Sequence, residues 1–167
     1  MAYEIKAPER PELTMLTRTV FLAGSIEMGA AEMWQERVVQ MLADVDRLVL
    51  FNPRRDDWDS SWVQDISCDV FREQVEWELD HIVHADEVLI YFAPDTKAPI
   101  TLAELGYCLG RNFRPVVVCP PAFYRRGNVQ IMCRRENAAF FDTLDDGVAE
   151  LRRRIQKAGS ESNREEH

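Results

Sequence analysis

Residues 87–119 read EVLIYFAPDTKAPITLAELGYCLGRNFRPVVVC: an apolar run, a proline-bounded loop, a helical segment and a second apolar run. The two apolar runs, residues 87–92 and 115–119, have the length and the β-branched content of strands that are buried on both faces. Residues 101–111, between them, have the apolar spacing of a helix. A strand, a helix and a strand in this order form one crossover of a parallel sheet.

The same alternation continues on either side of this stretch. Three further strands and three further helices are predicted: strands at residues 19–23, 48–51 and either 129–132 or 139–141, and helices at residues 30–43, 67–84 and 143–157. Strands that alternate with helices form a parallel sheet covered on both faces and joined by right-handed crossovers. The sequence therefore predicts a three-layer α/β fold on a five-stranded parallel sheet.

The chain of 167 residues has the size of one ordinary domain. Residues 1–17 are read as an irregular lead-in, residues 18–157 as the single domain and residues 158–167 as a disordered tail. The first residues show neither a basic start nor an apolar stretch, so no signal peptide is predicted. No apolar run approaches the ~18 residues that cross a bilayer, so no membrane association is predicted.

Charge and cysteine usage narrow the range of partners. The formal net charge is −9, and such a field repels DNA and RNA, so no nucleic acid polymer is expected as a partner. The cysteines are scattered without a C-x-x-C pair, which favours reduced thiols in a cytoplasmic protein over disulfides or a zinc site. His81 and His84 have helical spacing, but two ligands without a third define no metal site, so no metal is expected.

The ligands of parallel sheets bind beyond the carboxyl ends of the strands. Here those ends carry Gly24 and Ser25, the loop 52–62 and the loop 93–101. The segment GSIEMG (24–29) matches neither the dinucleotide fingerprint nor a P-loop. Its backbone amides and the Ser25 hydroxyl could form hydrogen bonds with an oxygen of a sugar or phosphate. The alternative interpretation of the segment is a plain strand-to-helix turn without a ligand.

Glu78 interrupts an apolar stripe on a predicted helix. At about 100° per residue, the stripe consists of Phe71, Val75, Leu79 and Ile82, and Glu78 falls inside it. A buried carboxylate is costly unless it is paired or hydrogen-bonded. Glu78 is therefore expected either at the rim of the sheet, beside the ligand, or paired with an arginine.

Glu104 has two interpretations. Thr101-Leu-Ala-Glu104 is a capping-box pattern, with Ile100 and Leu105 placed as a hydrophobic staple, and this pattern favours a structural role. Alternatively, a carboxylate in the first turn of a helix stays ionised beside the positive end of the helix dipole. An ionised carboxylate at the carboxyl end of a strand is what a carboxylate nucleophile requires.

The polar loop NPRRDDWDSSW (52–62) holds Trp58 and Trp62. An aromatic face in this loop fits stacking on a nucleobase, and burial in the core is the alternative. Asp57 and its neighbours Asp56 and Asp59 have two interpretations. They could form hydrogen bonds with the ring nitrogens of a nucleobase, or they could merely keep the loop soluble.

Three segments can be read together: FLAGSI (21–26), NPRRDDWD (52–59) and ITLAELG (100–106). Together they resemble the nucleoside 2-deoxyribosyltransferase family, in particular its bacterial deoxyribosyltransferase-like branch, and the resemblance extends over roughly residues 18–135. It implies a flavodoxin-like or Rossmann-like fold and a homo-oligomer whose neighbours complete each other's sites. It also implies nucleosides and nucleobases as ligands, without a cofactor.

The resemblance implies roles for individual residues. The glutamate of the Glu-Leu-Gly motif, here Glu104, attacks the anomeric carbon, and the acid eight residues before Asp86, here Glu78, contacts the sugar or the reacting centre. The chain departs from the family's pattern at Glu78, which is longer than the usual aspartate. It also departs at Ala98, where the transferases tend to have an aspartate and the related nucleotide hydrolases have a phosphate-binding serine. Asn128 is the counterpart of a residue that reaches the neighbouring subunit. The expected substrate-binding residues are Gly24, Ser25, Asn52, Asp57, Trp58, Ala98 and Asn128.

These inferences lead to one reaction and two alternatives. The reaction is transfer of a 2-deoxyribosyl group between nucleobases by double displacement, through a covalent ester of Glu104, with Glu78 or an acid of residues 56–59 protonating the leaving base. The first alternative is hydrolysis of the N-glycosidic bond in deoxynucleosides or their 5′-monophosphates. The second is a non-catalytic nucleoside- or nucleotide-binding module.

Overall fold

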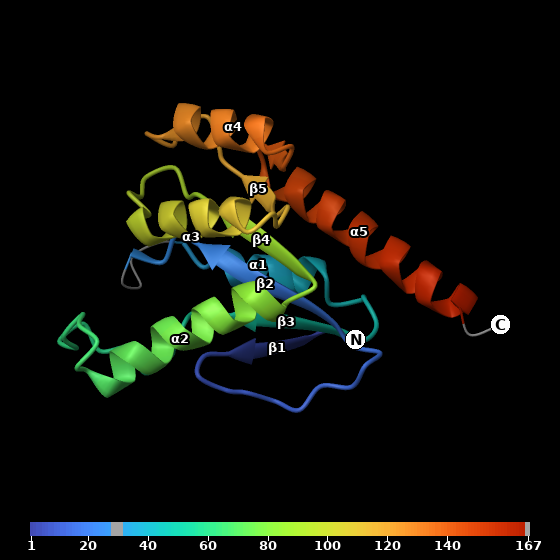
Figure 1. The fold of residues 1–167 in the computed structure, drawn as a ribbon, viewed down its shortest axis with the longest axis horizontal. Coiled ribbons are helices and arrows are strands. Elements are labelled where there is room, and N and C mark those ends of the chain that lie inside the picture. The colour runs from blue at the N-terminus through green and yellow to red at the C-terminus, as the bar shows by residue number, and fades with distance from the viewer. Residues whose placement is uncertain (28–31, 166–167) are drawn as a thin grey trace.

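The computed structural model describes residues 1–27 and 32–165, which form one open sheet with helices on both faces (Figure 1). All neighbouring strands are parallel, in the order β1-β3-β2-β4-β5-β6. The strands are β1 Tyr3–Lys6, β2 Arg18–Gly24, β3 Leu48–Asn52, β4 Glu87–Tyr91, β5 Val116–Val118 and β6 Ala139–Phe141. The helices are α1 Trp34–Met41, α2 Asp69–His84, α3 Pro99–Gly110, α4 Arg126–Arg135 and α5 Leu144–Glu165.

The predicted three-layer parallel α/β architecture is confirmed, with six strands rather than five. The additional strand is β1, within the segment expected to be an irregular lead-in, and it pairs with β3 from Tyr3↔Val49 to Lys6↔Asn52. Its four residues are too few, and too polar, to give a periodic signal. Of the two candidates for the last strand, residues 139–141 form β6, whereas residues 129–132 lie in α4.

Two predicted segments have different bounds in the structure. The closing helix α5 continues to Glu165, beyond the predicted end at Lys157. Helix α1 begins at Trp34, and residues 28–31, which include part of the GSIEMG segment and the predicted start of this helix, lie outside the described residues. Within the described ranges, no helix is both long and apolar enough for a membrane span.

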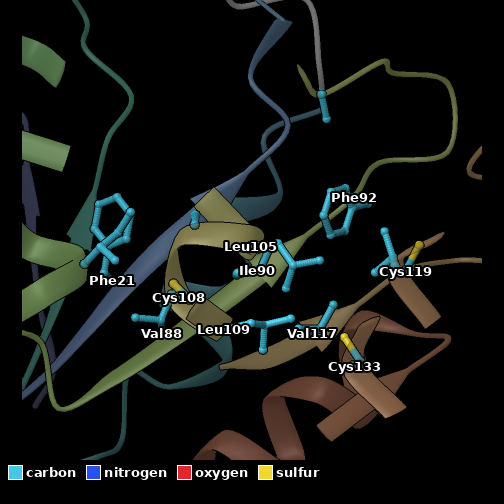
Figure 2. Close-up of a cluster of buried hydrophobic side chains, with 14 of the residues drawn as sticks. Phe21, Val88, Ile90, Phe92, Leu105, Cys108, Leu109, Val117, Cys119 and Cys133 are labelled. Carbon is cyan, nitrogen blue, oxygen red and sulfur yellow. The ribbon is translucent and has the colours of Figure 1, made fainter. Parts of the chain in front are cut away.

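Alternate residues of each strand enter two separate cores, because successive side chains of a strand point to opposite faces. In β4, Val88 and Ile90 join the core under α2, α3 and α4, whereas Leu89 and Tyr91 join the core under α1 and α5. Figure 2 shows the first core. The labelled residues are Phe21, Val88, Ile90, Phe92, Leu105, Cys108, Leu109, Val117, Cys119 and Cys133.

The four cysteines are free thiols, and they differ in exposure. Cys108, Cys119 and Cys133 are buried in the first core, whereas Cys68 is half-buried at the N-cap of α2. Burial raises the pKa of all three core thiols, to about 11 for Cys119 and about 12 for Cys108 and Cys133. The core cysteines therefore act as small apolar side chains.

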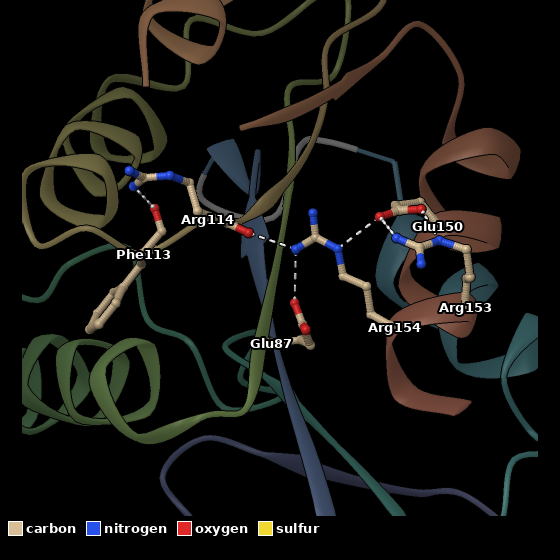
Figure 3. A network of polar contacts seen from close by, with 6 residues as sticks. All are labelled: Glu87, Phe113, Arg114, Glu150, Arg153 and Arg154. Atoms are coloured by element: carbon tan, nitrogen blue, oxygen red, sulfur yellow. Dashed lines mark hydrogen bonds and ion pairs between the residues drawn. The ribbon is translucent and has the colours of Figure 1, made fainter. Parts of the chain in front are cut away.

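Helix α5 is fixed to the sheet by a network around Arg154 (Figure 3). The Arg154 guanidinium donates to the carboxylate of Glu87 at 3.1 Å, to the carbonyl of Arg114 at 2.7 Å and to the carboxylate of Glu150 at 2.9 Å. Glu87 begins β4 and Arg114 precedes β5, so one side chain joins the last helix to two central strands.

The chain order creates a crevice at the carboxyl ends of β2 and β4. These two strands are neighbours in the sheet, but α1 leads from β2 to β3 on one side, and α3 leads from β4 to β5 on the other. Connections that diverge in this way leave a space between them, which is where open α/β sheets bind ligands.

Candidate active site

Ser25 joins the loops that follow β2 and β4. Its amide donates to the carbonyl of Tyr91 at 3.0 Å, and its hydroxyl oxygen accepts from the amide of Ala93 at 3.0 Å. The hydroxyl also lies 2.7 Å from that of Thr96, which itself donates to the carbonyl of Ala93 at 2.9 Å. Ser25 is thus at the predicted place, with its hydroxyl buried and already hydrogen-bonded within the protein.

Gly24 is required by close packing at the same point. A Cβ atom at this position would lie 2.5 Å from the Trp34 ring and 2.5 Å from the carbonyl oxygen of Tyr91. The Trp34 ring is held there by a hydrogen bond of 3.0 Å from its Nε1 to the carbonyl of Ser25. Gly24 therefore lets the end of β2 approach both α1 and β4.

Glu104 lies inside α3, in its second turn. The helix begins with Pro99 after the N-cap Ala98, so Thr101 is a helical residue and not a cap. Ile100 is 65% exposed and forms no hydrophobic staple, so the capping-box interpretation is wrong. The Glu104 side chain is instead buried, as is that of Leu105, the next residue of the helix.

Glu78 is held by Gln74, one turn earlier on α2. The Gln74 amide nitrogen donates to the Glu78 carboxylate at 2.7 Å and to the carbonyl of Pro53 at 2.8 Å. Among the described residues the other amide atom of Gln74, Oε1, is buried without a hydrogen-bond partner. Gln74 therefore connects Glu78 to the loop after β3 and retains one unused acceptor.

The buried face of α2 is rotated from the predicted stripe. Leu79 is 37% exposed, whereas Gln74 and Trp77 are buried. The predicted stripe was drawn through apolar residues, so it gave no indication that the polar Gln74 is buried.

The two acids interact electrostatically. Burial raises the pKa of Glu78 to about 7, against the opposing effect of the Gln74 hydrogen bond. Burial raises the pKa of Glu104 well above its ordinary value, and the charge of Glu78 raises it further. The helix dipole does not lower the pKa of Glu104 as expected, because Glu104 lies beyond the first turn and loses its hydration. The pair therefore holds a proton more tightly than two separate, hydrated carboxyl groups would.

Asn52, in the polar loop after β3, is fully buried and holds the loop together. Its amide donates to the carboxylate of Glu4 at 2.7 Å, and its carbonyl oxygen accepts from the amide of Arg54 at 3.0 Å. Arg54 in turn donates to the side chain of Gln35 at 2.8 Å and to the carbonyl of Glu32 at 2.5 Å. These contacts fasten the loop to β1 and α1.

The tryptophans of this loop pack on each other, with the Trp58 and Trp62 rings 5.1 Å apart in an edge-to-face arrangement. Trp58 Nε1 is buried and has no hydrogen-bond partner within the part of the chain that the structure describes. Asp57 is exposed and bonded to Arg55 at 2.9 Å, which lowers its pKa. Asp59 also has a lowered pKa, through hydrogen bonds from Ser61, so both aspartates are anions.

A pocket of about 550 Å³ opens next to the loop after β4. Glu78 and Glu104 are not among the described residues that line it, so the predicted cavity facing Glu104 is not this pocket. The lining consists of Glu27, Glu32, Tyr91, Ala93, Pro94, Asp95 and Thr96.

Two predicted binding residues remain to be placed. Ala98 is the N-cap of α3 and has a left-handed backbone, with φ 46°, and its amide donates to the Glu27 carboxylate at 2.6 Å. Asn128 is exposed on α4, apart from the crevice between β2 and β4. Gln74 and Glu27 were not predicted as site residues. The four-residue spacing from Gln74 to Glu78 could have revealed the first, whereas a loop residue such as Glu27 gives no periodic signal.

Comparisons with known proteins agree with this fold. A family model described as "Nucleoside 2-deoxyribosyltransferase like" matches residues 17–123, which include Glu78 and Glu104 but not Asn128. A crystal structure of a conserved protein from Enterococcus faecalis V583 has a similar fold, with a TM-score of 0.58 and 14% identity. The similarity covers 83% of this chain and 99% of that one. No curated protein sequence matches the chain.

Proposed function

The chain belongs to the nucleoside 2-deoxyribosyltransferase-like family, and we propose that it transfers a 2-deoxyribosyl group between nucleobases through a covalent ester of Glu104. The observation that carries this proposal is the proximity of the half-buried Glu78 on α2 to the buried Glu104 on α3, so that the charge of Glu78 raises the pKa of Glu104. Two acids that share a proton can divide the roles of nucleophile and general acid.

In the first step a Glu104 carboxylate oxygen bonds to C1′ of the nucleoside as the C1′–N bond breaks. The electron pair of that bond goes to the base nitrogen, and the base takes a proton from Glu78. In the second step the acceptor base gives its N–H proton to Glu78 and bonds to C1′, which releases Glu104 and restores the configuration. The reactive form of the pair has its single proton on Glu78.

The state of the loop acids supports Glu78 as the proton donor. Asp57 and Asp59 have lowered pKa values, so they are poor general acids at neutral pH. The pKa of Glu78, at about 7, is suited to both giving and taking a proton. Trp58 is proposed to stack on the base, since its ring and unpaired Nε1 lie in the loop after β3.

Incubation with deoxyinosine, with and without free adenine, tests the reaction. Formation of deoxyadenosine supports transfer, whereas release of hypoxanthine without exchange indicates that water takes the place of the acceptor. Saturable binding without either product would indicate a non-catalytic nucleoside-binding module.

Replacing Glu104 tests the nucleophile. Glu104→Gln should reduce kcat by at least about 10³-fold while nucleoside binding persists, because the amide keeps the shape but cannot form the ester. Glu76→Gln, at an exposed position of α2, is the matched control and should keep full activity. A 2-fluoro sugar analogue should add its mass to the peptide that contains Glu104, and full turnover by Glu104→Gln would refute the assignment.

A further inference from the structure

Gln74 is almost fully enclosed, yet its side chain leaves one polar atom without a partner. The residue is 4% exposed, on the buried face of α2. Its Nε2 group donates one hydrogen bond to the carbonyl of Pro53, at 2.8 Å, and one to Oε1 of Glu78, at 2.7 Å. Its own Oε1 atom is buried and accepts no hydrogen bond from the described residues, which lowers the stability of the fold.

The Pro53 carbonyl fixes the orientation of the Gln74 amide. This carbonyl belongs to a buried residue and can only accept hydrogen bonds. If the amide were turned over, its oxygen would face the Pro53 carbonyl and the Glu78 carboxylate, and both of these contacts would be repulsive. Gln74 therefore presents N–H groups to Glu78, although its own oxygen then remains unpaired. In this orientation it stabilises a charge on Glu78 but cannot accept the proton of that acid.

This one-sided contact decides which oxygen of Glu78 carries the proton. The oxygen that accepts from Gln74 is Oε1. In a protonated carboxyl group the carbonyl oxygen is a better acceptor than the hydroxyl oxygen, so the N–H of Gln74 favours a carbonyl at Oε1. The proton of Glu78 is thereby assigned to Oε2, the oxygen that Gln74 does not contact.

The contact also becomes stronger when Glu78 loses its proton, because an N–H group bonds a carboxylate more strongly than a neutral acid. Burial raises the pKa of Glu78 to about 7, and the hydrogen bond from Gln74 opposes this rise. The charged group that interacts with Glu78 from a neighbouring helix is Glu104 of α3, and two like charges disfavour each other. Gln74 thus favours the ionised form of Glu78, which burial and Glu104 disfavour.

We propose that Gln74 is a positioning residue that holds Glu78 with its proton on Oε2 and stabilises the carboxylate that remains when the leaving base takes this proton. In that step the O–H bond at Oε2 breaks, the hydrogen bonds to the base nitrogen, and the electron pair stays on Glu78. The part of Gln74 in the reaction rests on the proposed function, whereas its effect on the acid can be measured without turnover.

Gln74→Met tests the proposal, because methionine has nearly the same length but no N–H group. We expect the pKa of Glu78 to rise by about one pH unit in this variant, measured by NMR titration of isotope-labelled glutamate carboxyl groups. The signal that is absent from Glu78→Gln identifies Glu78. The kcat value should fall about tenfold at constant KM, and the alkaline limb of its pH profile should move upward with the pKa.

Trp77→Phe is the matched control on the same helix. It removes another buried hydrogen bond of α2 to a loop carbonyl, the one from Trp77 Nε1 to Glu9 at 2.8 Å, and leaves the contacts of Gln74 in place. This variant should lose stability without moving the pKa of Glu78 or the pH profile. An equal rise of the pKa in both variants would mean that loosening the helix is the cause, and it would overturn the proposal.

The wild type supplies a second measurement, which decides the test if Gln74→Met does not fold. The side-chain amide resonance of Gln74 should shift as Glu78 ionises, and this shift should be absent from Glu78→Gln. A resonance that does not titrate, or an active Gln74→Met with an unchanged kcat and pH profile, overturns the proposal. A raised pKa of Glu78 in Gln74→Met, without turnover of any nucleoside by the wild type, would uphold the effect of Gln74 on the acid and refute the proposed reaction.

Discussion

Glu78 and Glu104 are two carboxyl groups withdrawn from water on adjacent crossover helices of the chain. For each of them burial is the largest cause of the raised pKa, and for Glu104 the charge of Glu78 adds to it. Ionising both acids at once is therefore unfavourable. The loss of a proton from one acid depends on the charge of the other, so their titrations are coupled. Burying such a pair lowers the stability of the folded state at neutral pH.

This loss of stability can be measured. Because the folded pKa values are raised, the folded state binds more protons than the unfolded state from about pH 4.5 upward, so stability falls as pH rises to about 7. Glu78→Gln should remove the part of this fall that Glu78 causes and raise the free energy of unfolding at pH 8 by on the order of 2 kcal/mol, while the part caused by the burial of Glu104 remains. At pH 4 the variant and the wild type should be alike.

Urea denaturation at pH 4, 6 and 8 is the measurement. The control Glu76→Gln lies on the same helix but is exposed, and it should follow the wild type at each pH. Parallel pH curves for Glu78→Gln and the wild type would show that Glu78 is not shielded from solvent.

At the scale of elements, one half-buried arginine joins α5 to β4. Arg154 is 20% exposed and bonds Glu87 and Glu150, whereas Arg153 is 63% exposed and bonds Glu150 alone among the ion pairs of the described residues. Arg154→Ala should cost about 1–3 kcal/mol, because it leaves Glu87 partly buried without its cation.

Arg153→Ala is the matched control, with an expected change within about 0.5 kcal/mol, as for other exposed ion pairs. Thermal unfolding followed by circular dichroism compares the two variants. Equal losses of stability in both would mean that the link from α5 to β4 contributes nothing.

The elements differ in how well the sequence predicts them. The β2, β3, β4 and β5 segments were predicted because strands buried on both faces read as unbroken apolar runs. Strand β1 was missed because an edge strand of four residues, two of them charged, needs a partner to define it.

The site was predictable only in part. The alternation of strands and helices places Ser25 at the crevice between β2 and β4, and helical spacing identified Glu78 as an acid on an apolar face. The pKa of Glu104 and the position of Glu27 depend on contacts between loops distant in the sequence. Such contacts leave no periodic pattern, so only the three-dimensional structure reveals them.

At the scale of the whole molecule, α3 and α4 present apolar side chains to solvent. Ile100, Tyr107 and Ile131 are 65%, 36% and 67% exposed, on helices that share the first core. We expect exposed apolar side chains of these two helices to join copies of the chain, since such side chains can mark interaction sites. Ile131→Asp should therefore shift the mass measured by sedimentation toward the monomer.

The control for this prediction is Met15→Asp, which also places a charge at a fully exposed apolar residue but lies before β2, away from both helices. It should sediment like the wild type. A wild type that is monomeric at high concentration, or an unchanged mass for Ile131→Asp, would contradict the expected interface.

The uneven exposure of the thiols gives the unaltered chain a built-in attachment point for a dye. A maleimide fluorophore should react first at Cys68, because the other three sulfur atoms are enclosed and hold their protons more tightly. Cys68 is the N-cap residue of the helix that carries Glu78, so under the proposed function nucleoside binding should change the emission of that single label. Ligand titrations could then be followed optically without mutating any residue.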